Sequence, residues 1–169
     1  VKGVVYVIRD KQVSVEQMCD RALLAVRRIK GQYNIYVAAY DDTLRNQLLR
    51  EQAITDSMES ALSQNQFLVY LQPKYRIKDE ALVGAEALVR WNHPVWGFLS
   101  PAEFIPLFEK NGFITRLDRF VWEKACAVLH DWDERGYYPI SVSVNVSRAD
   151  IYNEDLADTL VKIIEKYDL

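Results

Sequence analysis

Three polar residues that could serve a divalent cation site or a buried ion pair lie in two segments with β-strand character. Glu86 and Arg90 belong to residues 82–91, and Asn145 belongs to residues 140–147. Because the side chains of a strand alternate between its two faces, Glu86 and Arg90 share one face with Leu88. The opposite face is apolar throughout: Val83, Ala85, Ala87, Val89 and Trp91. The pattern predicts that helices cover the apolar face and that Glu86 and Arg90 point the other way.

The second segment has the same two-sided pattern. Val142, Val144 and Val146 alternate with Asn145 and three serines. If both apolar faces contact the surrounding helices, Asn145 points into the same interior as Glu86 and Arg90. Asn145 lies near the carboxyl end of its segment, where (β/α) barrels place their active sites. A glutamate and an asparagine oxygen would suit Mg²⁺ or Mn²⁺.

A structural alternative explains the same residues without a site. A buried Glu86–Arg90 ion pair would satisfy both charges, and Asn145 would then cap a turn. The spacing of the residues alone leaves both interpretations open.

The surrounding elements are those of an α/β protein. Residues 67–72 and 82–91 are predicted to form a hairpin around a polar turn, the first strand stopping at Pro73. Ser100, followed by Pro101 and by Glu103, is typical of a helix start and predicts a helix that ends at Asn111. A longer helix over 114–132, a strand over 140–147 and a helix from Asn153 follow. Helices that alternate with strands imply a parallel sheet, with 140–147 parallel to 82–91.

The first 65 residues are organised differently. A strand over 3–8, a helix that begins after Ser14 and ends at Gly31, and an extended segment over 33–40 are predicted. About 40 residues are too few for a stable domain without added cross-links. Residues 42–62 follow as one long helix, which is either a linker between two domains or an amphipathic helix packed on its own domain.

Composition excludes several classes of function. The chain has a net charge of −3 and a sequence pI of about 5.5, without a basic block, so nucleic-acid binding is disfavoured. It contains no apolar run near the ~20 residues of a membrane span. Cys19 and Cys126 match no metal or redox spacing, which favours a cytoplasmic protein with reduced thiols. Because the chain starts inside an apolar run at Val1, we expect a piece of a longer protein whose remainder could carry a membrane anchor.

An ordered series of motifs resembles the opening of EAL domains. The series begins with Leu71-Gln72-Pro73, continues through the residues from Val83 to Trp91, and then includes His93-Pro94 and Gly97. It goes on with Ser100-Pro101, Phe104-Ile105-Pro106-Leu107 and Gly112-Phe113-Ile114, and Ser143-Val144-Asn145-Val146-Ser147 is similar to the family's VNxS strand. A second Glu-Ala-Leu triplet begins at Glu80, in the predicted turn.

The resemblance implies the first part of a TIM-type barrel that hydrolyses cyclic di-GMP to linear pGpG with two metal ions, Mg²⁺ or Mn²⁺. By position in the motifs, Glu86 and Asn145 would be metal ligands, and Glu86 would be the catalytic residue. Arg90 would contact a substrate phosphate. Gln72 and Leu88 would line the nucleotide site, together with Pro101. A catalytically degenerate cyclic di-GMP sensor or a regulatory scaffold remains the alternative.

The resemblance also implies that the catalytic groups are incomplete. The segment from Gln66 has about 100 residues, whereas a barrel has ~250. The family's other ligands and its general-base lysine would fall beyond Leu169. The chain alone is therefore expected to be inactive and to associate, as a homodimer or through the open edge of its barrel.

The first part of the chain resembles the end of a GGDEF domain. Cys19-Asp20-Arg21-Ala22-Leu23, followed by Lys30-Gly31, is similar to that domain's last helix, although Cys19, Leu24 and Arg27 depart from the usual pattern. The resemblance divides the chain into a GGDEF remnant (1–41), a linker helix (42–65) and the incomplete EAL domain (66–169). The GGDEF signature loop is absent from these residues, so no cyclase activity is inferred.

Overall fold

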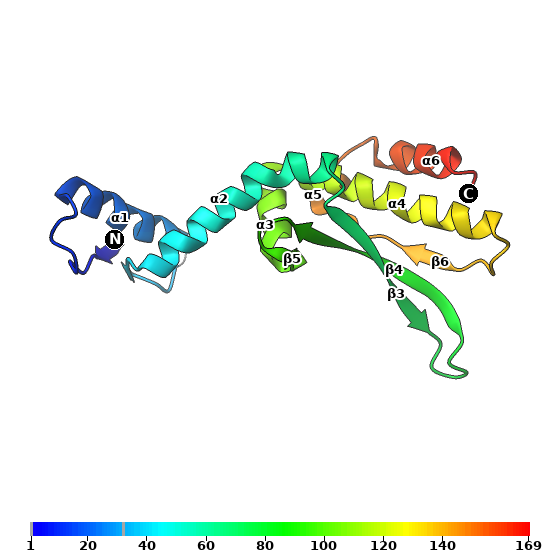
Figure 1. The fold of residues 1–169 in the computed structure, drawn as a ribbon, viewed down its shortest axis with the longest axis horizontal. Helices are drawn as coiled ribbons and strands as arrows, with labels where there is room; N and C mark the ends of the chain where they lie inside the picture. Colours follow the sequence, from blue (N-terminus) through cyan, green and yellow to red (C-terminus); the bar gives the residue numbers. More distant parts are fainter. Residues whose placement is uncertain (1, 32) are drawn as a thin grey trace. The chain divides into compact units, whose positions relative to one another are not determined.

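The computed structural model describes residues 2–31 and 33–169 and divides into two compact units. One unit ends at Ala53, and the other extends from Ile54 to Leu169. Helices and strands are mixed in both, as the sequence predicts (Figure 1). None of the helices in the described ranges is long and apolar enough to cross a membrane.

The first unit is a small βαβ arrangement. Strand β1 (Gly3–Val5) pairs in parallel with β2 (Val37–Ala39), and α1 (Val15–Ile29) connects them. The side chain of Ser14 accepts the amide of Gln17 and caps α1, as predicted. Both strands are shorter than the predicted segments. A small core of Ala25, Tyr40 and Leu44 closes the unit.

Helix α2 (Asp42–Ser63) begins in the first unit and ends in the second. Within the second unit its last three turns place Ile54 and Ala61 in the main core, with Met58 and Leu62 against it. This part of α2 is therefore an amphipathic helix packed on its own unit. The predicted boundaries of the three domains stay a prediction.

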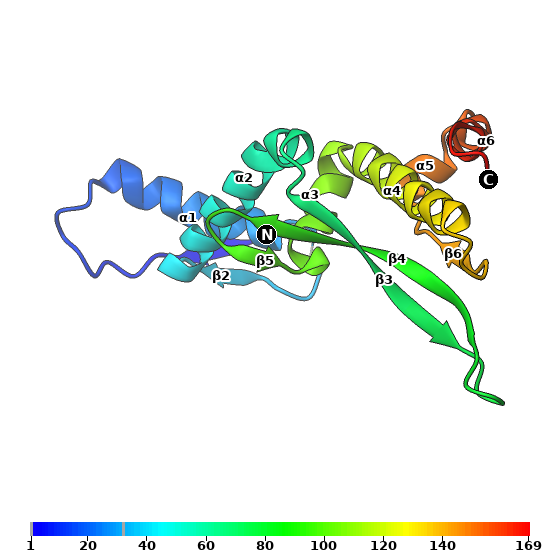
Figure 2. The ribbon, with the colours of Figure 1, turned by 45° about the vertical axis from the view of Figure 1, so that its right-hand side comes forward.

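The predicted hairpin is present. Strand β3 (Phe67–Tyr75) pairs antiparallel with β4 (Leu82–His93), and the two form a long twisted ribbon (Figure 2). The expectation that Pro73 ends the first strand is wrong, because β3 continues through Pro73, which lies opposite Ala85. Proline lacks an amide donor but is tolerated in a strand that has a partner on one side only, as β3 has among the described residues.

The apolar face of β4 receives helices, as predicted. After β5 (Gly97–Leu99), helices α3 (Pro101–Asn111) and α4 (Ile114–Glu134) pack against it. Trp91 is fully buried with Phe104 and Phe108 of α3, while Ala87 packs on Val121 of α4. The even-numbered face, which carries Glu86, is left outside this core.

The parallel pairing that defines the fold is also confirmed. Strand β6 (Ser141–Ser143) pairs in parallel with β4 after the α3–α4 crossover, and Ser143 lies opposite Glu86. The strand was predicted to extend to Ser147, but the chain leaves β4 after Ser143. A short helix α5 (Arg148–Ile151) was not predicted, and α6 (Leu156–Lys166) follows it and lies beside α4.

Candidate active site

The structure brings Glu86 and Asn145 together from different strands. Glu86 lies in the middle of β4, and Asn145 lies two residues after the end of β6. The Nδ2 amide of Asn145 donates to Oε1 of Glu86 over 3.2 Å. Because β4 and β6 run parallel, both side chains lie toward the carboxyl side of their paired segments, as expected for a barrel active site.

Lys74 of β3 is the cation that faces Glu86. Its Nζ lies 3.8 Å from Oε2 of Glu86 and donates to Oγ of Ser143 over 2.6 Å. The Ser143 hydroxyl in turn donates to the carbonyl of Ala85 over 3.3 Å. The Glu86–Arg90 ion pair of the alternative interpretation is therefore not formed. Sequence reasoning missed Lys74, although the hairpin register places it on the face of Glu86.

Gln72 is the direct cross-strand neighbour of Glu86. Their Cα atoms are partners in the β3–β4 ladder, so the two side chains lie on the same face of the ribbon. Gln72 is exposed. The predicted substrate-binding glutamine and the predicted metal-binding glutamate thus share one surface.

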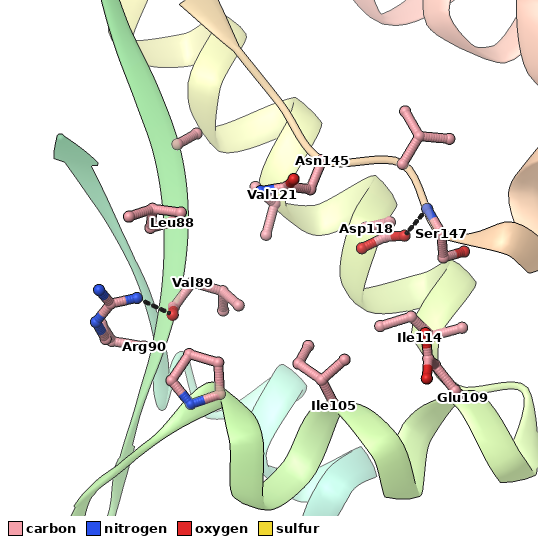
Figure 3. Close-up of a pocket in the computed structure, with 13 residues that line it drawn as sticks. Leu88, Val89, Arg90, Ile105, Glu109, Ile114, Asp118, Val121, Asn145 and Ser147 are labelled. Carbon is pink, nitrogen blue, oxygen red and sulfur yellow. Dashed lines mark hydrogen bonds between the residues drawn. The ribbon is translucent and has the colours of Figure 1, made fainter. Parts of the chain in front are cut away.

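A cavity of about 290 Å³ lies between β4, α3, α4 and the segment that follows β6 (Figure 3). Four of the six predicted site residues line it: Leu88, Arg90, Pro101 and Asn145. Its volume is at the lower end of the range of small-molecule sites, and its wall is mixed apolar and polar, as in such sites. Glu86 is connected to the cavity through its hydrogen bond with Asn145, and Gln72 lies outside it.

Arg90 is half-buried and has its guanidinium close to its own strand. Its Nη1 donates to the carbonyl of Val89 over 2.8 Å. Figure 3 shows that Arg90 and Leu88 point to the side of β4 opposite Val89. This orientation agrees with the predicted face, and the rest of the planar donor group can reach an oxygen-rich ligand.

Two buried aspartates that were not predicted contact Ser147, two residues after Asn145. Asp118 of α4 is 9% exposed and Asp150 of α5 is 4% exposed. Asp118 accepts the amide of Ser147 over 3.0 Å, and the Ser147 hydroxyl donates to Oδ2 of Asp150 over 2.6 Å. Burial, followed by the hydrogen bond with Asp150, raises the pKa of Asp118 to about 7.

The donor atoms present fit part of a hard-cation site. Neighbouring ligands of an octahedral Mg²⁺ lie roughly 3 Å apart, since each is about 2.0–2.1 Å from the ion. The 3.2 Å between the Glu86 and Asn145 side chains is compatible with that spacing once the amide oxygen turns inward. No group of three or more His, Cys, Asp or Glu side chains suited to a metal occurs within 2–31 and 33–169. By themselves, these two residues could supply only some of the ligands of such a site.

Comparison with known proteins assigns the unit that contains these residues to a family. The model of the EAL domain family matches residues 55–169, which include both β4 and β6. The chain belongs to the EAL-domain family. The match begins in α2 and covers the unit that contains the candidate site. It does not reach the β1–α1–β2 unit.

Relatives of this EAL chain include signalling enzymes of Pseudomonas aeruginosa. It is 33% identical over 133 residues to a cyclic di-GMP phosphodiesterase, which covers 78% of this chain and 22% of that protein. It is 26% identical over 160 residues to MucR, a bifunctional diguanylate cyclase/cyclic di-GMP phosphodiesterase, which covers 95% of this chain and 23% of MucR. The chain thus spans about a fifth of the length of these curated relatives.

Solved EAL structures have the same fold. The phosphodiesterase of MucR in complex with c-di-GMP superimposes with a TM-score of 0.66 and 29% identity, over 69% of this chain and 47% of that one. The EAL enzyme Bd1971 in its cGMP-bound form gives a TM-score of 0.62 and 25% identity, over 94% of this chain and 41% of that one.

Proposed function

We propose that this chain is the first part of an EAL domain that hydrolyses cyclic di-GMP to linear pGpG. The observation that carries the proposal is the 3.2 Å contact between Glu86 and Asn145, two side chains with metal-binding oxygens that lie 59 positions apart in the sequence. Its family membership and its similarity to cyclic di-GMP phosphodiesterases support the substrate.

Each residue of the site has a role that its position supports. Glu86 and Asn145 would hold Mg²⁺ or Mn²⁺, which when bound would polarise the phosphodiester and acidify water. The Arg90 guanidinium would bind a phosphate oxygen of the substrate, for which its planar donor group is suited. Leu88 and Gln72 would contact the nucleotide on the face of the β3–β4 ribbon that carries Glu86, and Pro101 would contact it from the start of α3.

We further propose that the β1–α1–β2 unit is the end of a GGDEF domain. The parallel strand pair with a connecting helix supports this assignment. So does the similarity to MucR, which extends over 95% of this chain and therefore includes that unit. The cyclase machinery would lie in another part of the protein.

Two copies of the Glu-Ala-Leu triplet supply a matched test. In the full-length protein, Glu86→Gln should lower the rate of pGpG release by at least about a hundredfold, because it replaces a charged ligand with a neutral one of equal size. Glu80→Gln, at an exposed turn outside the strands, should leave the rate within about twofold. Equal rates for the two variants would contradict the proposal. Binding of cyclic di-GMP without release of pGpG by the wild type would identify a sensor instead.

A further inference from the structure

The backbone around Asn145 is held by two side chains from one helix. Trp122 donates its Nε1 hydrogen to the carbonyl of Asn145 over 2.9 Å. Asp118 accepts the amide of Ser147 over 3.0 Å (Figure 3). The two residues lie four positions apart on α4 and so share one face of the helix. Together they fix the peptide groups on both sides of Val146.

These hydrogen bonds replace the strand ladder where it ends. Pairing between β6 and β4 stops at Ser143, two residues before Asn145. Trp122 is 3% exposed and Asp118 is 9% exposed, so water competes weakly for either bond. Without these two bonds, the Asn145 carbonyl and the Ser147 amide would have no hydrogen-bond partner in the sheet.

Val121 and Ala125 of α4 pack against Ala87 of β4, in an apolar cluster that includes neither Asp118 nor Trp122. The polar atoms of Asp118 and Trp122 point instead to the segment that leaves the sheet. Val121 and Ala125 therefore have a packing role, whereas the polar groups of Asp118 and Trp122 bind the backbone after β6.

We infer that Asp118 and Trp122 are positioning residues for Asn145. They set the direction in which the Asn145 side chain leaves the backbone, and so keep its amide beside Glu86. The inference rests on the proposed function, since it concerns the ligand role of Asn145. Residues that orient a metal ligand typically change metal affinity 10- to 100-fold when they are lost, without contacting the metal.

The test is calorimetric titration of Mn²⁺ into the full-length protein without substrate. Trp122→Phe removes the Nε1 donor and keeps a smaller aromatic side chain, and should weaken Mn²⁺ binding about tenfold or more. Trp132→Phe, the same change near the other end of α4, should leave the affinity unchanged. Asp118→Leu should weaken binding like Trp122→Phe. Asp118→Asn should restore it to within about threefold, because its amide oxygen can still accept the Ser147 amide.

A double-variant cycle separates positioning from general destabilisation. Adding Trp122→Phe to Asn145→Ala should weaken Mn²⁺ binding by less than about twofold further, because the side chain that it positions is already gone. A full additional loss in that background would overturn the inference. Should Asp118→Leu lose its melting transition, Trp122→Phe and Asp118→Asn alone decide the outcome.

Two single variants distinguish failure of the inference from failure of the proposed function. If Glu86→Gln and Asn145→Ala both leave Mn²⁺ affinity unchanged, the proposed site is wrong and the inference falls with it. If they weaken binding while Trp122→Phe and Asp118→Leu do not, only the inference is overturned.

Discussion

Lys74 and Glu86 face each other across the β3–β4 hairpin, with Nζ 3.8 Å from Oε2. The lysine is 49% exposed and the glutamate 35% exposed, so the pair contributes only about 0–1 kcal/mol to stability. Its effect on a divalent cation is larger. A proposed metal ligand is thus held next to a positive charge that opposes the binding of another cation.

Lys74→Met should therefore strengthen Mn²⁺ binding to the full-length protein. Two unit charges 4 Å apart interact by about 1 kcal/mol in water, and a divalent ion doubles the repulsion. This exceeds what an exposed ion pair provides by orienting Glu86, so we expect a gain of about three- to tenfold. The gain should shrink at high salt. Arg76→Met, which removes a cation at the hairpin turn, is the control, and weaker binding of Mn²⁺ by Lys74→Met would show that orientation of Glu86 dominates.

Gly84→Ala should separate β6 from β4. A Cβ at Gly84 would lie 2.8 Å from the carbonyl oxygen of Ser141, closer than such atoms approach, and 3.0 Å from its Oγ, which is a tight contact. Overpacking of this kind costs about 1–3 kcal/mol, which urea unfolding would measure. Gly3→Ala is the control, because the nearest atoms there are at 3.8 Å and 3.9 Å, an ordinary contact. Equal unfolding midpoints for the two variants would show that the pairing has room to adjust.

Asp118 should make stability depend on pH. Its pKa is raised to about 7 in the folded protein by burial and by Asp150, against 3.8 for an ordinary aspartate. Between these two values the folded state keeps a proton that the unfolded chain has lost, so the free energy of unfolding should fall as pH rises from about 4 to 7. The steepest slope for one proton is about 1.4 kcal/mol per pH unit.

The measurement is urea unfolding at several pH values between 5 and 8. Asp118→Asn should remove the decline, because the amide does not titrate. Asp133→Asn at the far end of α4 controls for the loss of one negative charge. A wild-type slope that persists in Asp118→Asn would assign the proton to another group. Since Asp118 and Asp150 are coupled, the slope belongs to the pair.

The 169-residue chain alone should release no measurable pGpG, even with Mn²⁺. One carboxylate and one amide cannot hold two ions about 3.5–4 Å apart, as two-metal phosphodiester cleavage requires. The assay is chromatography of the products formed from cyclic di-GMP. Turnover by the chain that disappears in Glu86→Gln would contradict the expectation and show that a working site assembles from these residues.

The isolated chain should also associate. Strand β6 pairs with β4 only, so its outer edge has no strand partner among the described residues. Unpaired edges of this kind tend to bind another strand. Light scattering should give a mass above the 19.7 kDa of one chain. A well-folded species at 19.7 kDa would contradict this prediction.

Period-two patterns predicted which faces of the strands carry the candidate residues. The alternation around Glu86 gave the correct face of β4, and the valines of 140–147 gave the correct face of β6, because each pattern is local. The helix start at Ser100 was also visible, with its reciprocal contacts to Glu103. Helix α5 has a similar start signal, since Ser147 is followed three residues later by Asp150. The predicted strand over 140–147 included Ser147 and so obscured this signal.

Long-range partners were outside the reach of sequence patterns. Lys74 faces Glu86 because of the hairpin register, and Asp118 reaches Ser147 because a helix returns across the sheet. Neither contact has a local signature. The end of β6 was missed for the same reason, since the side chains that hydrogen-bond the backbone after Ser143 lie on α4.

Helix α4 contacts both strands of the site at once. Through Val121 it packs on β4, and through Trp122 it binds the segment after β6. When the helix shifts, Glu86 and Asn145 should therefore move in the same direction, and the gap between them should change little. A shift of α4 that is caused by another part of the protein would then move Glu86 and Asn145 together relative to a bound phosphate. The activity of such a site would change with the distance between the two side chains and the substrate, while the distance between Glu86 and Asn145 stayed the same.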